Sequence, residues 1–267
     1  MVRLCVVLLV AGWAMAAAEA APIAIEDRNS TVWIDPESPA GMSPWVVDGT
    51  DHLFQQWFWY RLEGMGQEQS LDHLGFLGAQ TSDTNSLVDP RDDTLTAYYG
   101  DLQGFHVEAK FGVQGGLPGS GASDVAEQIA FHNLTDETVR LWFFEYADFD
   151  LNGTADNDTV RIQGGNTALQ SDAVATVSET VVLTMPVRLE TNFYDNTLQS
   201  LTDDAVTLLN DDAGPHTGNV TWAFEWELEV PAGGTLHISK DKNLIPEPAT
   251  LALLSLGAAV LLRRRSR

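Results

Sequence analysis

Two segments of the chain alternate apolar and polar residues with a period of two. In residues 220–230 six apolar side chains, among them Trp222, Phe224 and Trp226, alternate with mostly polar residues. Residues 105–113 repeat the pattern. Since successive side chains of a β-strand point to opposite faces of the sheet, both segments predict half-buried strands.

Further segments are rich in Val, Thr and aromatic residues and are bounded by clusters of Gly, Pro, Asn and Asp, which is typical of strands and turns. We expect strands at Thr31–Ile34, Leu53–Leu62, Thr94–Tyr99, Val125–Phe131, Thr138–Tyr146, Thr159–Gln163, Thr180–Leu183, Val187–Tyr194 and Thr235–Ser239. Residues 198–210 fit either a short helix or another strand. The pattern predicts an all-β fold, a single jelly-roll-like β-sandwich with few short helices.

The N-terminal residues 1–20 have the composition of a secretory signal peptide. Arg3 provides a positive start, residues 4–14 are mainly apolar, and Ala18 and Ala20 form an A-x-A cleavage site. The alternative is a transmembrane helix, but the apolar run is short and ends in small residues. Cys5, the only cysteine of the chain, falls in this segment, so the exported body has no disulfide.

The C-terminal residues 246–267 combine three features in a fixed order, which are a Pro-Glu-Pro triplet, an uncharged apolar run and a basic end. The residues are Pro246, Glu247 and Pro248, then Ala249–Leu262, then Arg263, Arg264 and Arg265. As a helix the run would span about 21 Å, less than the roughly 30 Å of a bilayer core. The basic end should stay on the cytoplasmic side of a membrane.

This tail resembles the PEP-CTERM sorting signal, which is read by an exosortase. The resemblance implies export through the secretion translocon, a transient stay in the inner membrane and cleavage near the triplet. It also implies release to the cell surface or into exopolysaccharide. A permanent stop-transfer anchor is the alternative. The resemblance covers only the tail and implies no activity for the rest of the chain.

Removal of both ends leaves a body of residues 22–245, which we expect to be one domain. The body keeps 9 of the 14 Lys and Arg residues and 36 of the 38 Asp and Glu residues, a formal charge of −27. Such a charge argues against nucleic acid as a partner and favours attraction of cations.

One acidic loop is a candidate calcium site. Asp148, Asp150 and Asn152 alternate before Gly153, and Asp156 follows, as at positions 1, 3, 5, 6 and 9 of a calcium-binding loop. Position 12 is a threonine and not the bidentate glutamate that an EF-hand requires. The alternative is an acidic hairpin turn, because Asn-Gly is a strong turn dipeptide.

Two runs of contiguous aromatic residues, 57–60 and 142–144, have a structural and a functional interpretation. Large aromatic side chains usually fill the interior of a sandwich. On an exposed face, Trp and Tyr rings could instead stack on sugars. We expect most of these rings to belong to the core.

The sequence offers no catalytic residue to assign. It has no H-E-x-x-H, no G-x-S-x-G and no Walker loop, and its six histidines are scattered. Glu225, Glu227 and Glu229 share one strand face and could supply one carboxylate of a glycosidase pair. A solvated acidic face is the interpretation that we favour.

The resemblance of the tail implies a protein of the cell surface or extracellular matrix, and the lack of catalytic motifs favours a structural or adhesive, non-enzymatic role. A carbohydrate-binding module within exopolysaccharide is the first alternative, and a secreted polysaccharide hydrolase is the second. Apart from the candidate calcium ion, no cofactor is expected.

Overall fold

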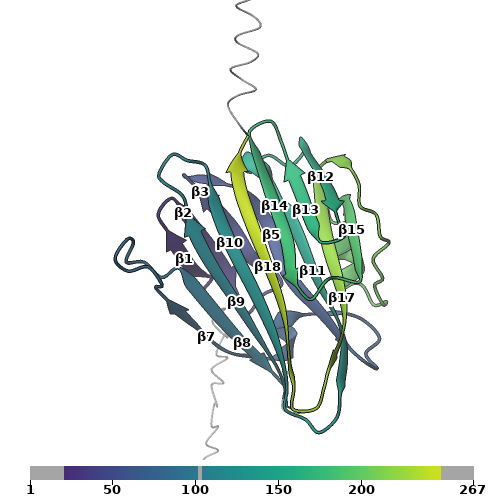
Figure 1. Ribbon diagram of the computed structural model, residues 1–267. Helices are drawn as coiled ribbons and strands as arrows, with labels where there is room; N and C mark the ends of the chain where they lie inside the picture. The colour runs from purple at the N-terminus through teal and green to yellow at the C-terminus, as the bar shows by residue number, and fades with distance from the viewer. Residues whose placement is uncertain (1–20, 102–103, 248–267) are drawn as a thin grey trace, which may run out of the picture.

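The alternating segments form strands in the computed structural model, which describes residues 21–101 and 104–247. β17 spans Val220–Val230 and β9 spans Phe105–Gly115, and both alternate buried and more exposed residues over much of their length. The all-β prediction is confirmed, because the described chain folds as two large, mainly antiparallel sheets that face each other (Figure 1).

Sheet A has the strand order β1-β2-β3-β5-β11-β17-β15, with the two-residue strands β4 (Thr50–Asp51) and β6 (Gln69–Ser70) added beside β3 and β5. Its other strands are β1 (Ile23–Asp27), β2 (Ser30–Asp35), β3 (Gly41–Val47), β5 (Leu53–Leu62), β11 (Val139–Phe149) and β15 (Arg188–Phe193).

Sheet B has the order β16-β12-β13-β14-β18-β10-β9-β8-β7. Its strands besides β9 are β7 (Phe76–Ser82), β8 (Thr94–Gly100), β10 (Ser123–Asn133), β12 (Asp158–Gln163), β13 (Thr167–Ser171), β14 (Ala175–Leu183), β16 (His216–Gly218) and β18 (Thr235–Pro246).

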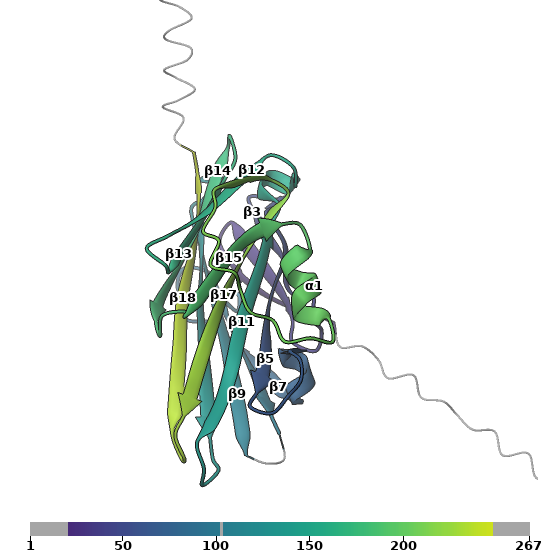
Figure 2. The same cartoon turned by 90° about the vertical axis from the view of Figure 1, so that its right-hand side faces the viewer.

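Helices are few in the described residues, as predicted. The ambiguous segment 198–210 divides into the end of α1 (Asn196–Thr202) and an irregular stretch after it. Two short 3₁₀ helices are η1 (Leu71–Leu74) and η2 (Leu151–Gly153). Figure 2 shows the sheets nearly edge-on, with α1 outside sheet A.

The expected signal peptide at residues 1–20 lies outside the described residues. So do Pro248 and the rest of the tail, including its apolar run. Within residues 21–101 and 104–247, no helix is both long and apolar enough to span a membrane.

Aromatic rings fill the space between the sheets. Phe143 of β11 packs edge-on against Phe131 of β10, with ring centroids 4.9 Å apart, and also contacts Phe58 and Trp226. All four rings are fully buried. They join both sheets, so the predicted strand faces meet in one apolar layer.

Five charged side chains are buried in the same layer and form what we call the charge cluster. They are Glu127 of β10, Glu145 of β11, Glu179 of β14, and Lys240 and Lys242 of β18. None of the five residues is more than 2 % exposed. Only Glu145 comes from sheet A, so its carboxylate links the two sheets.

Lys242 lies at the centre of this cluster. Its Nζ is 2.7 Å from Glu127, 2.9 Å from Glu145 and 3.3 Å from Glu179. Lys240 contacts the same three carboxylates and lies 4.7 Å from the centre of the Phe58 ring. Trp222 adds a hydrogen bond by donating its Nε1–H to Glu179 Oε2 at 2.8 Å.

The cluster has three glutamates but only two lysines, and the pKa shifts indicate which glutamate holds a proton. Burial and the negative charge of Glu179 raise the pKa of Glu145 to about 8. Burial also opposes ionisation of Glu179, but Lys242 and Lys240 outweigh it and lower the pKa of Glu179 to about 2. At neutral pH Glu145 is therefore mainly protonated.

We predict that Glu145→Gln makes the protein more stable at alkaline pH. Because folding raises the pKa of Glu145, its protonated carboxyl stabilises the folded state fully below the unfolded pKa of about 4.3. This stabilisation is lost as the pH rises towards 8. Gln keeps the neutral form at every pH. The variant should gain on the order of 2 kcal/mol over the wild type at pH 9 and little at pH 5, measured by urea unfolding.

Glu227→Gln is the control, because Glu227 is exposed on a neighbouring strand of the same sheet. It should leave the pH dependence unchanged. A Glu145→Gln variant that unfolds with the wild-type pH profile would contradict a protonated Glu145 in the folded protein.

Candidate functional site

The junction between the sandwich and the tail is ordered into the sheet. Pro246 is the last residue of β18 and pairs with Ala175, the first residue of β14. Glu247 follows, and its backbone N–H donates to the carbonyl oxygen of Val174 at 2.7 Å. The Thr176 hydroxyl donates to Glu247 Oε1. The first two residues of the triplet are thus held by the connection between β13 and β14 and the start of β14.

Proline chemistry explains why the strand ends here. The residue before a proline favours extended backbone, and Ile245 is accordingly in β18. Proline lacks an N–H and fits only the margin of a β ladder. Of the predicted sorting residues, the structure describes Pro246 and Glu247, whereas Arg263, Arg264 and Arg265 lie outside the described residues, as do Ala18 and Ala20 of the predicted cleavage site.

The candidate calcium loop has its side chains directed to different partners. Asp148, at the end of β11, is buried, and its Oδ2 accepts a hydrogen bond from the Tyr146 hydroxyl at 3.3 Å. Asn152 donates its side-chain amide to Asp172 at 2.8 Å. Asp156 is exposed. The structure places Asp148 and Asn152 in separate hydrogen-bond networks.

Negative charge nevertheless gathers around this loop. Burial and the charge of Asp150 raise the pKa of Asp148 to about 7. Burial and the charges of Asp51 and Asp156 raise the pKa of Asp150. In residues 21–101 and 104–247, no three His, Cys, Asp or Glu side chains are grouped so that they could hold a metal ion. The calcium site stays a prediction.

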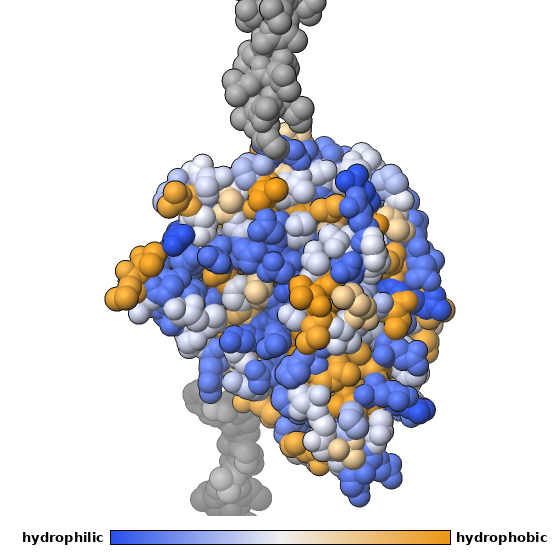
Figure 3. Space-filling view, in the orientation of Figure 1, coloured by the Kyte–Doolittle hydropathy of each residue, from blue (hydrophilic) through white to orange (hydrophobic). Residues whose placement is uncertain are grey.

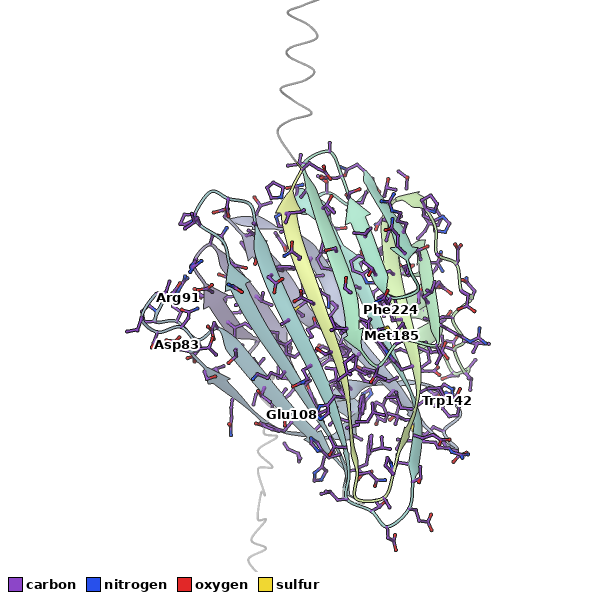
Figure 4. All side chains as sticks on the ribbon, viewed as in Figure 1. Asp83, Arg91, Glu108, Trp142, Met185 and Phe224 are labelled. Atoms are coloured by element: carbon purple, nitrogen blue, oxygen red, sulfur yellow. The ribbon has the colours of Figure 1, made fainter. Side chains whose placement is uncertain are left out.

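The contiguous aromatic residues belong to the core, with the exception of Trp142. Trp57, Phe58, Trp59 and Tyr60 are each at most 5 % exposed. Trp142 is partly buried, and the Arg61 guanidinium carbon lies 3.8 Å from the centre of its ring. Figure 4 labels Trp142 on β11. The structural interpretation of these runs is confirmed.

The three glutamates of β17 have different environments. Glu227 and Glu229 are exposed, as a solvated face requires. For Glu225 this expectation is wrong, since only 1 % of the residue is exposed and its Oε2 accepts the backbone N–H of Leu209 at 3.0 Å. Glu225 is buried because residues 203–210 cross the outer face of sheet A and cover it. We call this segment the strap.

Two buried glutamates that sequence reasoning missed hold the same strap. Glu68 Oε2 accepts the N–H of Thr207 at 2.9 Å, and its other oxygen pairs with Arg61 at 2.8 Å. Glu190 Oε2 accepts the N–H of Asn210 at 3.1 Å. Their sequence neighbours give no sign of this role, because each glutamate binds backbone far along the chain.

The histidines have separate surroundings. His106 and His132 face each other across β9 and β10 on the outer face of sheet B. His216 contacts Asp212 at 2.9 Å, and His52 is buried, which lowers its pKa. His73 is exposed in η1, and His237 lies on β18. The structure therefore gives none of them a catalytic partner that we can name.

A polar cavity of about 500 Å³ lies at the end of the sandwich opposite to the tail. Its lining includes Glu63, Asp136, Glu137 and Arg140. The Arg140 guanidinium lies 2.9 Å from Glu229 and 3.7 Å from Glu63. The cavity offers several hydrogen-bond donors and acceptors on a side of the body that points away from residue 247.

The comparisons with known proteins match the tail to a family model. Residues 244–266 match the PEP-CTERM protein-sorting motif. No curated protein matches the chain in sequence.

Solved structures match the body in fold. A bacterial glucoamylase complexed with acarbose has a TM-score of 0.55 and 11 % identity, over 86 % of this chain and 32 % of that chain. A putative aldose 1-epimerase from Escherichia coli K12 has a TM-score of 0.52 and 9 % identity, over 85 % of this chain and 99 % of that chain. This chain thus spans about a third of the glucoamylase, and at these identities the likeness shows the fold alone.

The matched motif covers the tail and begins inside β18, the last strand of the sandwich. The sorting motif and the folded body therefore share residues. Residues 244–266 of the chain are thus a PEP-CTERM protein-sorting motif, which implies export, an exosortase as processing partner and sorting to the cell surface.

Proposed function

We propose that the protein is a structural or adhesive component of the cell surface or extracellular matrix and has no enzymatic activity. The observation that carries this proposal is the PEP-CTERM motif at residues 244–266, which begins inside β18 of the sandwich. The translocon, the exosortase and, transiently, the inner membrane would be its partners during export.

The chemistry of the body supports a non-enzymatic role. Of the candidate catalytic carboxylates, Glu225 accepts a backbone N–H from the strap and is used in holding it. Glu68 and Glu190 hold the same strap. A glycosidase needs two carboxyl groups facing each other at about 5–10 Å across an accessible cleft. Hydrolysis of polysaccharide therefore ranks below the structural role.

The sorting proposal predicts that deletion of residues 248–267 abolishes the transient membrane-bound precursor, so that newly made protein no longer passes through the membrane fraction in a pulse-chase. The body remains folded, because the deletion leaves β18 whole, but the apolar run that would hold the precursor in the membrane is gone. Immunoblots of the cell-surface, membrane and medium fractions measure the change.

A matched change in the body is Arg161→Ala, which removes an exposed arginine from β12. Its distribution should equal that of the wild type. If the deleted chain passes through the membrane fraction as the wild type does, the tail does not direct the sorting.

Carbohydrate binding is the second function that we propose, at the polar cavity. Glu63, Asp136, Glu137 and Arg140 offer the carboxylate and guanidinium groups that bind sugar hydroxyls. The structural neighbours include a glucoamylase complexed with acarbose, which places a sugar-related ligand on a protein that shares this fold. The cavity end would face outward while the opposite end lies at the tail.

This second proposal predicts that the body binds glycans on an array and that Arg140→Ala weakens the binding at least tenfold. The loss follows because truncation removes charge-assisted hydrogen bonds. Arg188→Ala is the control. Arg188 lies on β15, where it pairs with Asp211, and it does not line this cavity. Equal binding by both variants would exclude the cavity as the binding surface.

We also propose calcium as a ligand of the loop that contains Asp148, Asp150, Asn152 and Asp156. Support comes from the pKa values of Asp148 and Asp150, which burial and the charges of neighbouring carboxylates raise; a divalent cation would relieve that repulsion. Binding requires Asn152 to leave Asp172. Millimolar affinity is the expected range for an extracellular module.

The expected result is a higher Tm in several millimolar calcium, by mass action on the folded state. Asp150→Asn should abolish the increase, and Asp136→Asn, an exposed aspartate at the other end of the sandwich, should retain it. An unchanged wild-type Tm across the titration would dismiss the site.

A further inference from the structure

The sorting motif and the folded body share residues. The motif begins at residue 244, and β18 continues to Pro246. Leu244 is fully buried in the core and pairs with Val177 of β14 and Ser123 of β10. The start of the sorting motif is therefore a core strand of the sandwich.

β18 cannot be shortened from its C-terminal end without loss of core contacts. The strand lies between β10 and β14 and forms an antiparallel ladder with each. Four residues before Pro246 it carries Lys242, whose ammonium group touches three buried carboxylates. Breaking a buried ion pair leaves uncompensated charge in a medium of low polarity, which is strongly unfavourable.

The hold on the chain extends one residue beyond the strand. Glu247 is fixed through its backbone N–H to Val174 and through its carboxylate to the Thr176 hydroxyl. Pro246 packs beside Gly121, where a Cβ on Gly121 would lie 3.5 Å from the ring. Peptide bonds that precede Glu247 lie within this bonded region.

We propose that processing cuts the chain on the C-terminal side of Glu247, so that the mature protein keeps all of β18 and the first two residues of the triplet. This inference rests on the proposed sorting function. A processing enzyme needs an accessible peptide bond, and the bonds before Glu247 are held in the sheet. The folded body thus determines where its own sorting motif can be cut.

The reaction is hydrolysis of a peptide bond. Water adds its oxygen to the carbonyl carbon of Glu247 or of a later residue, and the bond from that carbon to the next nitrogen breaks. The body gains a terminal carboxylate, and the tail leaves with a protonated amine. A cut directly after Glu247 would give a tail that starts with the secondary amine of Pro248.

The test is the mass of the C-terminal peptide of the mature protein, isolated from the surface fraction of cells that express the full chain. The expected peptide ends at Glu247 or a few residues beyond and lacks Ala249–Leu262. A mature C-terminus at Pro246 or earlier overturns the inference and leaves the sorting function standing. A surface form that keeps the whole tail contradicts both.

Thr176→Val tests the hold itself. The variant keeps the shape of the side chain on β14 but removes the hydroxyl that binds Glu247. We expect shorter C-termini, ending at or before Pro246, to appear beside the wild-type product. An unchanged product would overturn the role of the Thr176 contact in placing the cut.

Thr180→Val is the matched control on the same strand and face. It removes the hydroxyl contact to Thr167 at 3.2 Å and leaves the triplet untouched. Its C-terminal peptide should equal that of the wild type. If Thr180→Val gives the same shorter products as Thr176→Val, general loosening of β14 and not the Glu247 contact determines the cut.

Discussion

The contact of Lys240 and Lys242 with three buried glutamates is the interaction on which the sandwich depends. The two lysines lie two positions apart, so the pleat of β18 directs both to the interior. There they meet carboxylates from β10, β14 and β11. The cluster fixes the positions of three neighbouring strands of sheet B relative to one strand of sheet A, in the middle of an otherwise aromatic layer.

Such a cluster contributes to specificity of pairing more than to net stability. Desolvation of five ionisable groups offsets much of their attraction, and an apolar core of the same volume could be as stable. A shift of β18 by one residue would turn both lysines to the outer face and leave three glutamates without positive charge. The broad outer face of sheet B is mostly hydrophilic, with hydrophobic atoms towards the side where Figure 4 labels Met185 (Figure 3). That face would impose a weaker constraint on the register.

Local patterns predicted the fold where one face of a strand is apolar. The bounds of β17 and β5 follow from the sequence because their aromatic residues are unmistakable. The C-terminal half of β18 was missed, since Lys240, Asp241 and Lys242 give the pattern of a charged loop. The sequence alone could not show that Lys240 and Lys242 point inward, because their partners Glu127, Glu145 and Glu179 come from other strands. The burial of Glu225 was missed for the same reason, because the strap that covers it comes from residues without a strand pattern.

The tail could be recognised in full from the sequence because its three parts are contiguous. The sequence could not show whether the calcium loop has the geometry of a metal site. That geometry depends on the hydrogen bonds that Asp148 and Asn152 make with Tyr146 and Asp172. That the triplet begins inside the sheet was also not visible. It depends on Val174 and Thr176, about 70 residues earlier in the chain.

The position of β18 has a consequence for the timing of export. A chain threaded through the translocon from its N-terminus presents Glu127, Glu145 and Glu179 to the far side long before Lys242 arrives. Until then three carboxylates that belong in the interior have no counter-charge, and sheet B lacks the strand that lies between β10 and β14. Closure of the sandwich before β18 arrives is therefore unfavourable. Folding becomes favourable at the moment when only the sorting tail is left to follow.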